Sequence, residues 1–280
     1  MKCTELAHAK VNLTLDVGAK RPDGYHAVES VMQRIGLWDT VTVERGGERD
    51  RLLCDTAVTE NDGDNLCMRA VGAFFAGAER RDGVTVTLRK RIPMQAGLGG
   101  GSSDAAAVLR ALRTLYAPSM PDAQLEKIAA ALGSDVPFFI RGGTALATGR
   151  GEVIAPLPPL TAGWFVVVKP EEGYSTAEMY RRLDALGIGA RPRSLMAEAV
   201  AGNNIHAVAA ELRNSFEQAV PAGSSLWEIK AALRAQGALG TLLSGSGSAV
   251  FGVFDDRYAA LAAAKALRGA WPRVFVARPV

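Results

Sequence analysis

The chain has 280 residues, of which 48% are hydrophobic and 22% are charged, as is typical of a globular protein with one large or two ordinary domains. The formal net charge is only +3, without a long basic run, so we do not expect a nucleic-acid-binding surface. No apolar run has membrane-spanning length and no secretory leader pattern is visible, so neither a membrane span nor export is expected. Three cysteines without a C-x-x-C pair favour reduced thiols in a cytoplasmic protein.

Apolar and polar residues alternate from Lys10 to Val17, which predicts a single strand with one apolar and one polar face. Since alternate side chains of a strand share a face, Lys10 and Asn12 are expected to point the same way. A lysine on the polar face of a strand is by default a solvated charge. It becomes a functional candidate only if a carboxylate lies beside it, because a nearby cation favours the ionised acid.

Turn and strand patterns continue through the next segment. Arg21-Pro22-Asp23-Gly24 has the composition of a turn, in which proline presets φ and glycine follows. Further strands are predicted over residues 40–44 and 84–88. The basic triplet Arg89-Lys90-Arg91 after the second of these strands is expected to be a solvated strand end.

A glycine-rich segment then leads into a helix pattern. It reads Pro93-Met94-Gln95-Ala96-Gly97-Leu98-Gly99-Gly100-Gly101-Ser102-Ser103. The P-loop template fails because Ser103 stands in place of the lysine, and the dinucleotide template fails because Ser102 stands in place of the third glycine. Ser102 or Ser103 is expected to cap the helix, with Asp104 in its first turn. Glycine backbone and a helix start together favour a phosphate, so we predict an anion site built from N–H groups.

An acid follows the next predicted helix. That helix covers residues 122–132, and Gly133 fits the position just after its end. Asp135 then precedes Val136, which Pro137 is expected to hold in an extended conformation. Asp135 is either a catalytic carboxylate or a local cap or turn acid, and the residues alone leave these interpretations open.

The second half of the chain predicts a different arrangement. Strands over 144–148 and 153–157 flank a hairpin turn, and the proline-rich segment 155–159 is the best domain boundary. Beyond it the expected order is a strand at 164–169, helices opened by Ser175-x-x-Glu178, a helix at 226–235, strands at 239–243 and 249–254, a helix at 258–267 and a last strand. This order is close to the split β-α-β arrangement. Between two of the strands, the small-residue loop Gly245-Ser246-Gly247-Ser248 is either a tight turn or a second phosphate clamp.

Together these motifs resemble the GHMP kinases. The glycine segment is similar to the phosphate loop of that superfamily, and Gly245-Ser246-Gly247 is similar to its C-terminal glycine motif. The segments at 9–13, 21–26 and 133–139 narrow the resemblance to the branch that phosphorylates a cytidine diphosphate alcohol. The motifs occur in the family's order over nearly the whole chain.

The resemblance implies an α+β fold of two domains. Residues 1–157 would form a ribosomal-S5-like N-terminal domain that carries the ATP loop. Residues 158–280 would form a ferredoxin-like C-terminal domain, in agreement with the element order predicted above.

The resemblance also implies roles for individual residues. Lys10 and Asp135 match the catalytic pair of the family. The ATP-binding positions would be Asn65, Leu66, Pro93, Met94, Gln95, Ala96, Gly97, Leu98, Gly99, Gly100, Gly101, Ser102 and Ser103. The acceptor-binding positions would be Asn12, Tyr25, His26, Tyr180, Gly245, Ser246 and Gly247.

The implied reaction is phosphoryl transfer from ATP, with Mg²⁺ expected because it bridges phosphate oxygens in such reactions. The sequence does not show which residues would bind Mg²⁺, and Ser102 or Ser103 is the candidate ligand. Two other functions stay open: a kinase of the same superfamily acting on another small alcohol, and a non-catalytic nucleotide- or RNA-binding module on the same fold.

Overall fold

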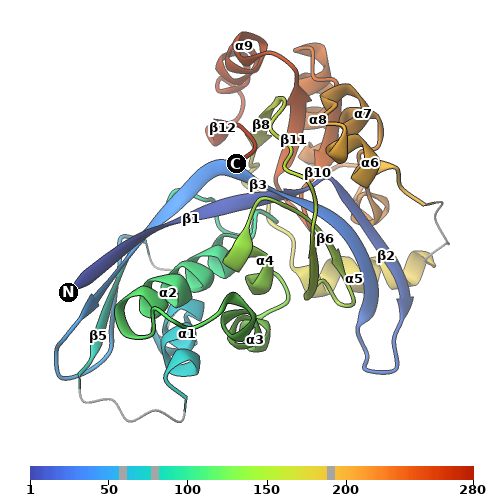
Figure 1. Ribbon diagram of the computed structural model, residues 1–280. Coiled ribbons are helices and arrows are strands. Elements are labelled where there is room, and N and C mark those ends of the chain that lie inside the picture. The colour runs from blue at the N-terminus through green and yellow to red at the C-terminus, as the bar shows by residue number, and fades with distance from the viewer. Residues whose placement is uncertain (57–61, 77–81, 188–192) are drawn as a thin grey trace. The chain divides into compact units, whose positions relative to one another are not determined.

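The computed structural model describes residues 1–56, 62–76, 82–187 and 193–280. Two compact units make up the chain: unit 1 is Met1–Ala9, Trp38–Ile92 and Gly99–Gly142, and unit 2 is Lys10–Leu37, Pro93–Leu98 and Gly143–Val280. The long strands β1 (Lys2–Asn12) and β3 (His26–Arg45), blue in Figure 1, contribute residues to both units. The predicted domain boundary after residue 157 stays a prediction.

Unit 1 combines a small sheet with a group of helices. Strand β5 (Val84–Arg89) pairs antiparallel with the second half of β3 and parallel with β4 (Arg51–Cys54). Around the alanine-rich helix α2 pack three further helices (Figure 1). In chain order the helices are η1 (Asp62–Asp64), α1 (Leu66–Phe74), α2 (Gly100–Tyr116), α3 (Asp122–Leu132) and α4 (Val136–Arg141). The small buried side chains of α2 allow its neighbours to approach closely.

Unit 2 begins with strands that pair with the first half of β3. Strand β2 (Thr14–Lys20) pairs antiparallel with β3 and parallel with β9 (Arg213–Asn214). Strand β6 (Thr144–Thr148) pairs with β3 and with β7 (Val153–Pro156), and the hairpin between β6 and β7 is the predicted one.

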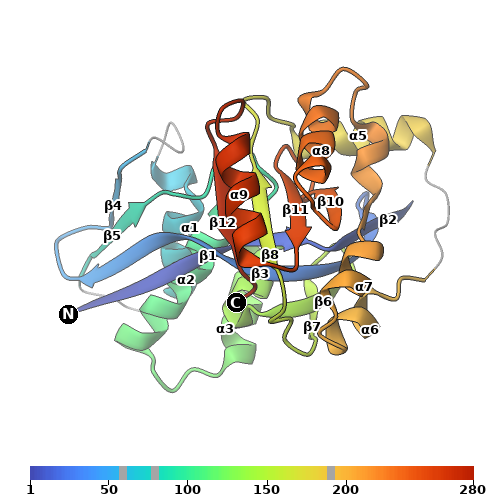
Figure 2. The ribbon, with the colours of Figure 1, turned by 90° about the horizontal axis from the view of Figure 1, so that it is seen from above.

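The rest of unit 2 contains a four-stranded antiparallel sheet in the order β10-β11-β8-β12. Its strands are β8 (Trp164–Val168), β10 (Gly240–Leu243), β11 (Val250–Phe254) and β12 (Val274–Ala277). Helix α8 (Ser225–Ala235) packs on β10 and β11, and α9 (Arg257–Leu267) packs on β8 and β12 (Figure 2). This strand order confirms the ferredoxin-like prediction. Between β8 and α8 lie α5 (Thr176–Leu186), α6 (Met196–Ala201), α7 (Ile205–Ala210) and η2 (Ser215–Ala219).

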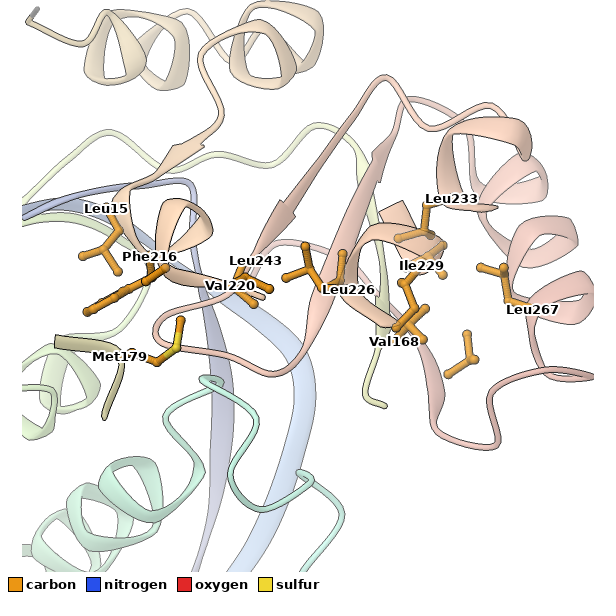
Figure 3. Packing of buried hydrophobic residues seen from close by; sticks show 14 of the residues in the cluster. Leu15, Val168, Met179, Phe216, Val220, Leu226, Ile229, Leu233, Leu243 and Leu267 are labelled. Carbon is orange, nitrogen blue, oxygen red and sulfur yellow. The ribbon is translucent and has the colours of Figure 1, made fainter. Parts of the chain in front are cut away.

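Buried apolar side chains hold the helices of unit 2 to this sheet (Figure 3). Leu226, Ile229 and Leu233 recur at helical spacing along α8 and are fully buried, with Val168 of β8 in the same cluster. Burying a side chain of this size stabilises the fold by about 1.5–3 kcal/mol. Among the described residues, no helix has both the length and the apolar character needed to cross a bilayer.

The strand expected from Lys10 to Val17 is in fact two strands. Strand β1 ends at Asn12 and β2 begins at Thr14. At Leu13 between them, the N–H donates to the Val31 carbonyl, and the carbonyl accepts from the Arg213 N–H. Both strands pair with β3, and a bend at Leu13 separates them. A period-two pattern does not reveal such a local interruption, so the prediction of one strand was wrong.

The start of helix α2 also differs from the prediction. Its N-cap is Gly99 at φ +72°, without a capping side chain, and Asp104 lies in the second turn. The Ser103 hydroxyl instead donates to the His8 carbonyl at 2.6 Å. The glycine takes the left-handed conformation that a serine would adopt only with strain, so the helix begins three residues earlier than a serine cap at Ser102 allows.

The residues around Asp135 are helical rather than extended. Val136 is the first residue of α4, with Pro137 directly after it. Proline is tolerated in the first turn of a helix because the N–H groups there have no intrahelical partner. Val136, Phe138 and Phe139 are all buried in this conformation, and that burial outweighs the bias that Pro137 imposes on Val136.

Candidate active site

Two glycine-containing loops that lie far apart in the sequence meet in unit 2. The segment Pro93–Leu98 lies against the β10–β11 connection, Ser244–Ala249. Three hydrogen bonds join them: Ser248 N–H to the Gln95 carbonyl (3.3 Å), Ala249 N–H to the Ala96 carbonyl (3.1 Å) and the Ser244 hydroxyl to the Gly97 carbonyl (3.0 Å). The Gly245-Ser246-Gly247 segment is therefore a second loop packed on the first. It also makes a tight turn, in which the Gly247 N–H donates to the Ser244 carbonyl at 2.9 Å, and its role as a phosphate clamp stays a prediction.

The contact is close enough to require glycine on both sides. Gly97 has φ +71°, and a Cβ on it would lie 1.9 Å from the carbonyl oxygen of Ser244. Gly245 has φ +55°, and a Cβ on it would lie 3.0 Å from the carbonyl oxygen of Gly97. Backbone thus packs directly on backbone at this point.

We expect Gly97→Ala to lower the free energy of unfolding by about 1–3 kcal/mol more than Gly143→Ala does, because the new Cβ overlaps a fixed backbone oxygen. Gly143 is a matched control, since it has φ +75° but nothing within 4 Å of its Cβ position. Urea unfolding of both variants measures the difference. Equal losses would mean that only the backbone conformation, and not the loop contact, requires glycine.

Lys10 reaches the same place from the end of β1. Its N–H donates to the Leu98 carbonyl at 3.0 Å, and its ammonium donates to Asn12 Oδ1 at 2.6 Å. A Cβ on Gly245 would lie 3.4 Å from Lys10 Nζ. Only 4% of Lys10 is exposed, so it is not the solvated charge that its strand position suggests by default.

A chain of hydrogen bonds fixes the orientation of the Asn12 amide. Its nitrogen donates to the Ser30 hydroxyl at 2.8 Å, and Ser30 donates in turn to the Thr14 carbonyl at 2.6 Å. Because the Ser30 hydroxyl hydrogen is used on Thr14, Ser30 accepts from the Asn12 nitrogen, and the Asn12 oxygen must face Lys10. The prediction that Lys10 and Asn12 share a face is confirmed.

Three of the predicted acceptor-binding residues also lie in unit 2. His26 Nε2 is 2.7 Å from Asp184 Oδ1, and the His26 ring stacks on Tyr180 with centroids 5.0 Å apart. Tyr25 is 57% exposed, and the Arg150 guanidinium lies over its ring. An exposed aromatic next to a buried, oriented imidazole offers both a stacking face and hydrogen-bonding groups.

The predicted nucleotide residues of unit 1 gather at the starts of α1 and α2. Asn65 caps α1, because its Oδ1 accepts from the Cys67 N–H at 2.9 Å. A Cβ on Gly101 would lie 3.6 Å from Leu66 Cδ1, so Leu66 packs beside the first turn of α2. The unpaired N–H groups and the positive dipole end of α2 begin at Gly100.

Asp135 is the N-cap residue of α4 in unit 1, but its side chain makes no capping hydrogen bond. The interpretation of Asp135 as a side-chain cap is therefore wrong. Lys10 belongs to unit 2, so the meeting of Lys10 with Asp135 stays a prediction.

A buried charged cluster near the start of α2 was missed from the sequence. Lys90 forms ion pairs with Asp39 and Asp104, so the prediction that it is a solvated strand end was wrong. Asp104 shares its helical face with Val108, Ala111 and Leu112, all fully buried. An acid on the same helical face as apolar residues at i+4, i+7 and i+8 was the sequence signal that could have predicted a buried carboxylate at Asp104.

Comparison with known proteins identifies the family. The GHMP kinases N terminal domain matches residues 65–143, and the GHMP kinases C terminal domain matches residues 196–273. A 4-diphosphocytidyl-2-C-methyl-D-erythritol kinase of Geobacter sulfurreducens is 42% identical over 272 residues, which are 95% of each chain. The chain belongs to the 4-diphosphocytidyl-2-C-methyl-D-erythritol kinase family of the GHMP kinases.

Other members of this kinase family are similar over the same length. An enzyme of that name from Clostridium botulinum is 37% identical over 276 residues, which cover 98% of this chain and 99% of the relative. A crystal structure of a 4-(cytidine 5'-diphospho)-2C-methyl-D-erythritol kinase superposes with a TM-score of 0.83 at 38% identity, over 98% of each chain. The GHMP kinase fold expected from the sequence motifs is thereby confirmed.

Proposed function

We propose that this protein uses ATP to phosphorylate the 2-hydroxyl of 4-diphosphocytidyl-2-C-methyl-D-erythritol, which yields the 2-phosphate and ADP. The reaction is a step in non-mevalonate isoprenoid precursor biosynthesis. The observation that carries the proposal is the near-full-length similarity, at 37–42% identity, to kinases named for this substrate. The position of Lys10 beside both glycine loops supports it, because phosphoryl transfer needs a cation held beside a phosphate cradle.

The proposed ATP site uses backbone rather than a P-loop lysine. The segment from Pro93 to Ser103 would hold the phosphates through its N–H groups and the α2 dipole. Asn65 and Leu66 would line the adenine pocket, and the packing of Leu66 beside Gly101 supports this assignment. Lys10 would supply the positive charge that the loop lacks.

The proposed chemistry needs little more than positioning. An acceptor oxygen forms a bond to the γ-phosphorus while the bond from that phosphorus to the bridging oxygen of ADP breaks. Asp135 would take the hydroxyl proton, and Lys10 would stabilise the negative charge on the transferring group. This assigns Asp135 and Lys10 the roles of base and electrostatic stabiliser.

The acceptor would be held by the remaining residues of unit 2. Tyr25 and Tyr180 offer rings for a cytosine, and His26 offers hydrogen bonds to its edge. Asn12 and the segment Gly245–Gly247 would hold the polar alcohol and the diphosphate. The fixed orientation of the Asn12 amide supports a role in ordering the acceptor.

Mg²⁺ is part of the proposal as a companion of ATP. Among the described residues, no group of three His, Cys, Asp or Glu side chains could hold a metal ion. Mg²⁺ bound to nucleotide commonly keeps its waters and takes only one or two protein oxygens, so this chain fits such a site. Ser102, a partly buried residue, is the better candidate, because the Ser103 hydroxyl donates to the His8 carbonyl. When bound, the ion would neutralise charge on the phosphates.

The test measures ADP release from purified protein and ATP with a panel of alcohols. The cytidine diphosphate alcohol should give by far the largest kcat/KM, with little release for homoserine or mevalonate derivatives. Preference for another alcohol would favour a different specificity on the same fold. Absence of release with every alcohol would favour a non-catalytic nucleotide-binding module.

The proposed location is the cytoplasm, where ATP is available.

A further inference from the structure

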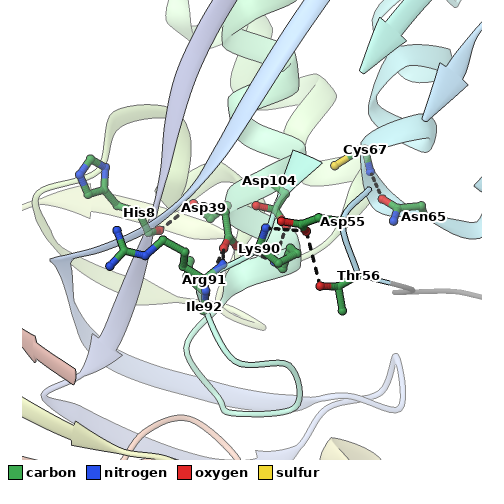
Figure 4. A network of polar contacts seen from close by, with 11 residues as sticks. His8, Asp39, Asp55, Thr56, Asn65, Cys67, Lys90, Arg91, Ile92 and Asp104 are labelled. Atoms are coloured by element: carbon green, nitrogen blue, oxygen red, sulfur yellow. Dashed lines mark hydrogen bonds and ion pairs between the residues drawn. The ribbon is translucent and has the colours of Figure 1, made fainter. Parts of the chain in front are cut away.

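Three charged side chains are buried together in unit 1 (Figure 4). Lys90 Nζ lies 2.5 Å from Asp39 Oδ2 and 2.7 Å from Asp104 Oδ2. The exposed fractions of the three side chains are 8% for Lys90, 0% for Asp39 and 3% for Asp104. Burying ions at this depth requires that each be paired and hydrogen-bonded.

The two carboxyl groups are not satisfied equally. Asp39 Oδ1 accepts hydrogen bonds from the backbone N–H groups of Arg91 and Ile92, in addition to the ion pair of its other oxygen. Asp104 Oδ1 is buried and has no hydrogen-bond partner among the described residues. The hydrogen bonds therefore favour the ionised form of Asp39, and Asp104 is the acid that keeps a proton.

The charges around Asp104 agree with this assignment. Burial, the largest cause, raises the pKa of Asp104 to about 8, while the Lys90 ammonium opposes the shift and Asp39 adds to it. Burial lowers the pKa of Lys90, but Asp104 and Asp39 outweigh it, so Lys90 stays charged. Burial and then the Asp104 charge raise the pKa of the Cys67 thiol on α1 well above its ordinary value. With one ammonium and one carboxylate, the cluster is neutral near pH 7.

The cluster lies directly beside the first turn of α2. A Cβ on Gly100, the first residue of the helix, would lie 3.4 Å from Lys90 Nζ. Asp104 follows Gly100 by four residues, so it is one helical turn further along on the same side. Ionisation of Asp104 would add a buried negative charge one turn from the N–H groups that point at a phosphate.

We propose that Asp104 is a positioning residue whose bound proton keeps the start of α2 suitable for a polyphosphate, so that ATP binding is coupled to proton uptake at this acid. The inference rests on the proposed ATP site. Its physical basis is that an anionic ligand at the helix start and an ionised Asp104 repel each other in a medium that screens them poorly.

The sign of the coupling follows from that repulsion. Bound ATP disfavours the ionised form of Asp104, so its pKa is higher in the complex than in the free protein. Between these two pKa values, binding takes up a proton, and the Kd for ATP rises with pH. A difference of one pKa unit corresponds to about a tenfold weaker Kd at high pH than at neutral pH.

Isothermal titration calorimetry of ATP with Mg²⁺, without acceptor, tests the proposal between pH 7.5 and pH 9.5. This range lies above the titration of the terminal phosphate, whose second pKa is about 6. For the unaltered protein, a one-unit difference above a pKa of about 8 gives a rise in Kd of about sixfold across the range. At pH 8 the binding heat should differ between two buffers of different ionisation enthalpy, which reports the proton taken up.

Asp104→Asn removes the titrating group but keeps an oxygen that Lys90 can donate to. It should give a Kd independent of pH in this range and no buffer-dependent heat. Asp122→Asn changes a more exposed acid that pairs with Arg113, and Cys67→Ala removes the neighbouring thiol; both should keep the pH dependence. If Asp104→Asn fails to fold, the buffer-dependent heats of the unaltered protein still show whether ATP binding takes up a proton.

Two results would overturn the proposal while leaving the ATP site intact: a Kd that stays constant from pH 7.5 to 9.5, or an unchanged pH dependence in Asp104→Asn. Loss of the pH dependence in Cys67→Ala alone would assign the proton to the thiol instead. Absence of ATP binding at every pH would contradict the proposed function itself, and the coupling with it.

Discussion

Asp135→Asn is expected to lower kcat by about 10²–10⁴-fold, because the amide cannot take the proton of the acceptor hydroxyl. The fold should persist, because asparagine has nearly the size and shape of aspartate and α4 does not use this side chain as a cap. The affinity for ATP should change little, because the phosphates would be held by backbone N–H groups rather than by this carboxylate. Steady-state kinetics with the cytidine diphosphate alcohol, together with calorimetry of ATP binding, measure both effects.

Asp256→Asn is the matched control for that variant. Asp256 is also an N-cap aspartate, on α9, and its carboxylate accepts from the Ala259 N–H. Asparagine is an equally good N-cap, so this change should leave kcat within about twofold. A kcat for Asp135→Asn within that same margin would exclude Asp135 as the base. A large loss of ATP affinity would make it a nucleotide-binding residue instead.

Lys10→Met is expected to lower kcat by about 10²–10³-fold, which is the effect of removing one preorganised group that stabilises charge in the transition state. Methionine fills much of the buried volume that Lys10 occupies, but it removes the charge and the hydrogen bond to Asn12. The KM for ATP should change far less than kcat, because the proposed role of the ammonium is on the transferring group.

Lys20→Met provides the control, since Lys20 is exposed at the end of β2 and lies outside the proposed site. Its kinetics should match those of the unaltered protein. If Lys10→Met instead raises the KM for ATP strongly at nearly constant kcat, Lys10 is a ground-state phosphate contact and the catalytic assignment is wrong. Thermal unfolding of both variants shows whether loss of the bond to Asn12 destabilises the fold.

The sequence predicted the arrangement of the ferredoxin-like part well, because its elements are short, strongly patterned and connected locally. In that part the four-stranded order is as expected. Before it in the chain, strand β6 and helix α3 have the predicted ends, and the hairpin between β6 and β7 is the expected one. The same periodicity failed from Lys10 to Val17. There a bend at Leu13 interrupts the strand, although the segments on both sides pair with β3, and alternation does not encode such an interruption.

The glycine loop was recognised from the sequence, but the details of its helix start were not. Serine is a good cap by propensity, yet Gly99 takes that position, and the Ser103 hydroxyl bonds to β1. Lys90 was misread for a related reason. Three consecutive basic residues suggest a solvated segment, and only the fold brings Asp39 and Asp104 to the second of them.

The contact between the two glycine loops could be expected only through the family resemblance. Nothing in the pattern of Gly245-Ser246-Gly247 indicates that its backbone packs on Gly97, about 150 residues away in the chain. The tight distances at both glycines are the reason that a side chain at either position is expected to be destabilising. These positions are glycine because the backbone there has a positive φ and packs closely on other backbone, and not because the loops need to be mobile.

The measurement that tests the central claim most directly is ³¹P NMR of purified protein incubated with ATP, Mg²⁺ and 4-diphosphocytidyl-2-C-methyl-D-erythritol. We predict a new phosphomonoester signal at the 2-position of the acceptor, equal in amount to the ADP formed, and neither product with Asp135→Asn on the same time scale. ADP accompanied only by inorganic phosphate, or an acceptor that stays unmodified, would contradict the account.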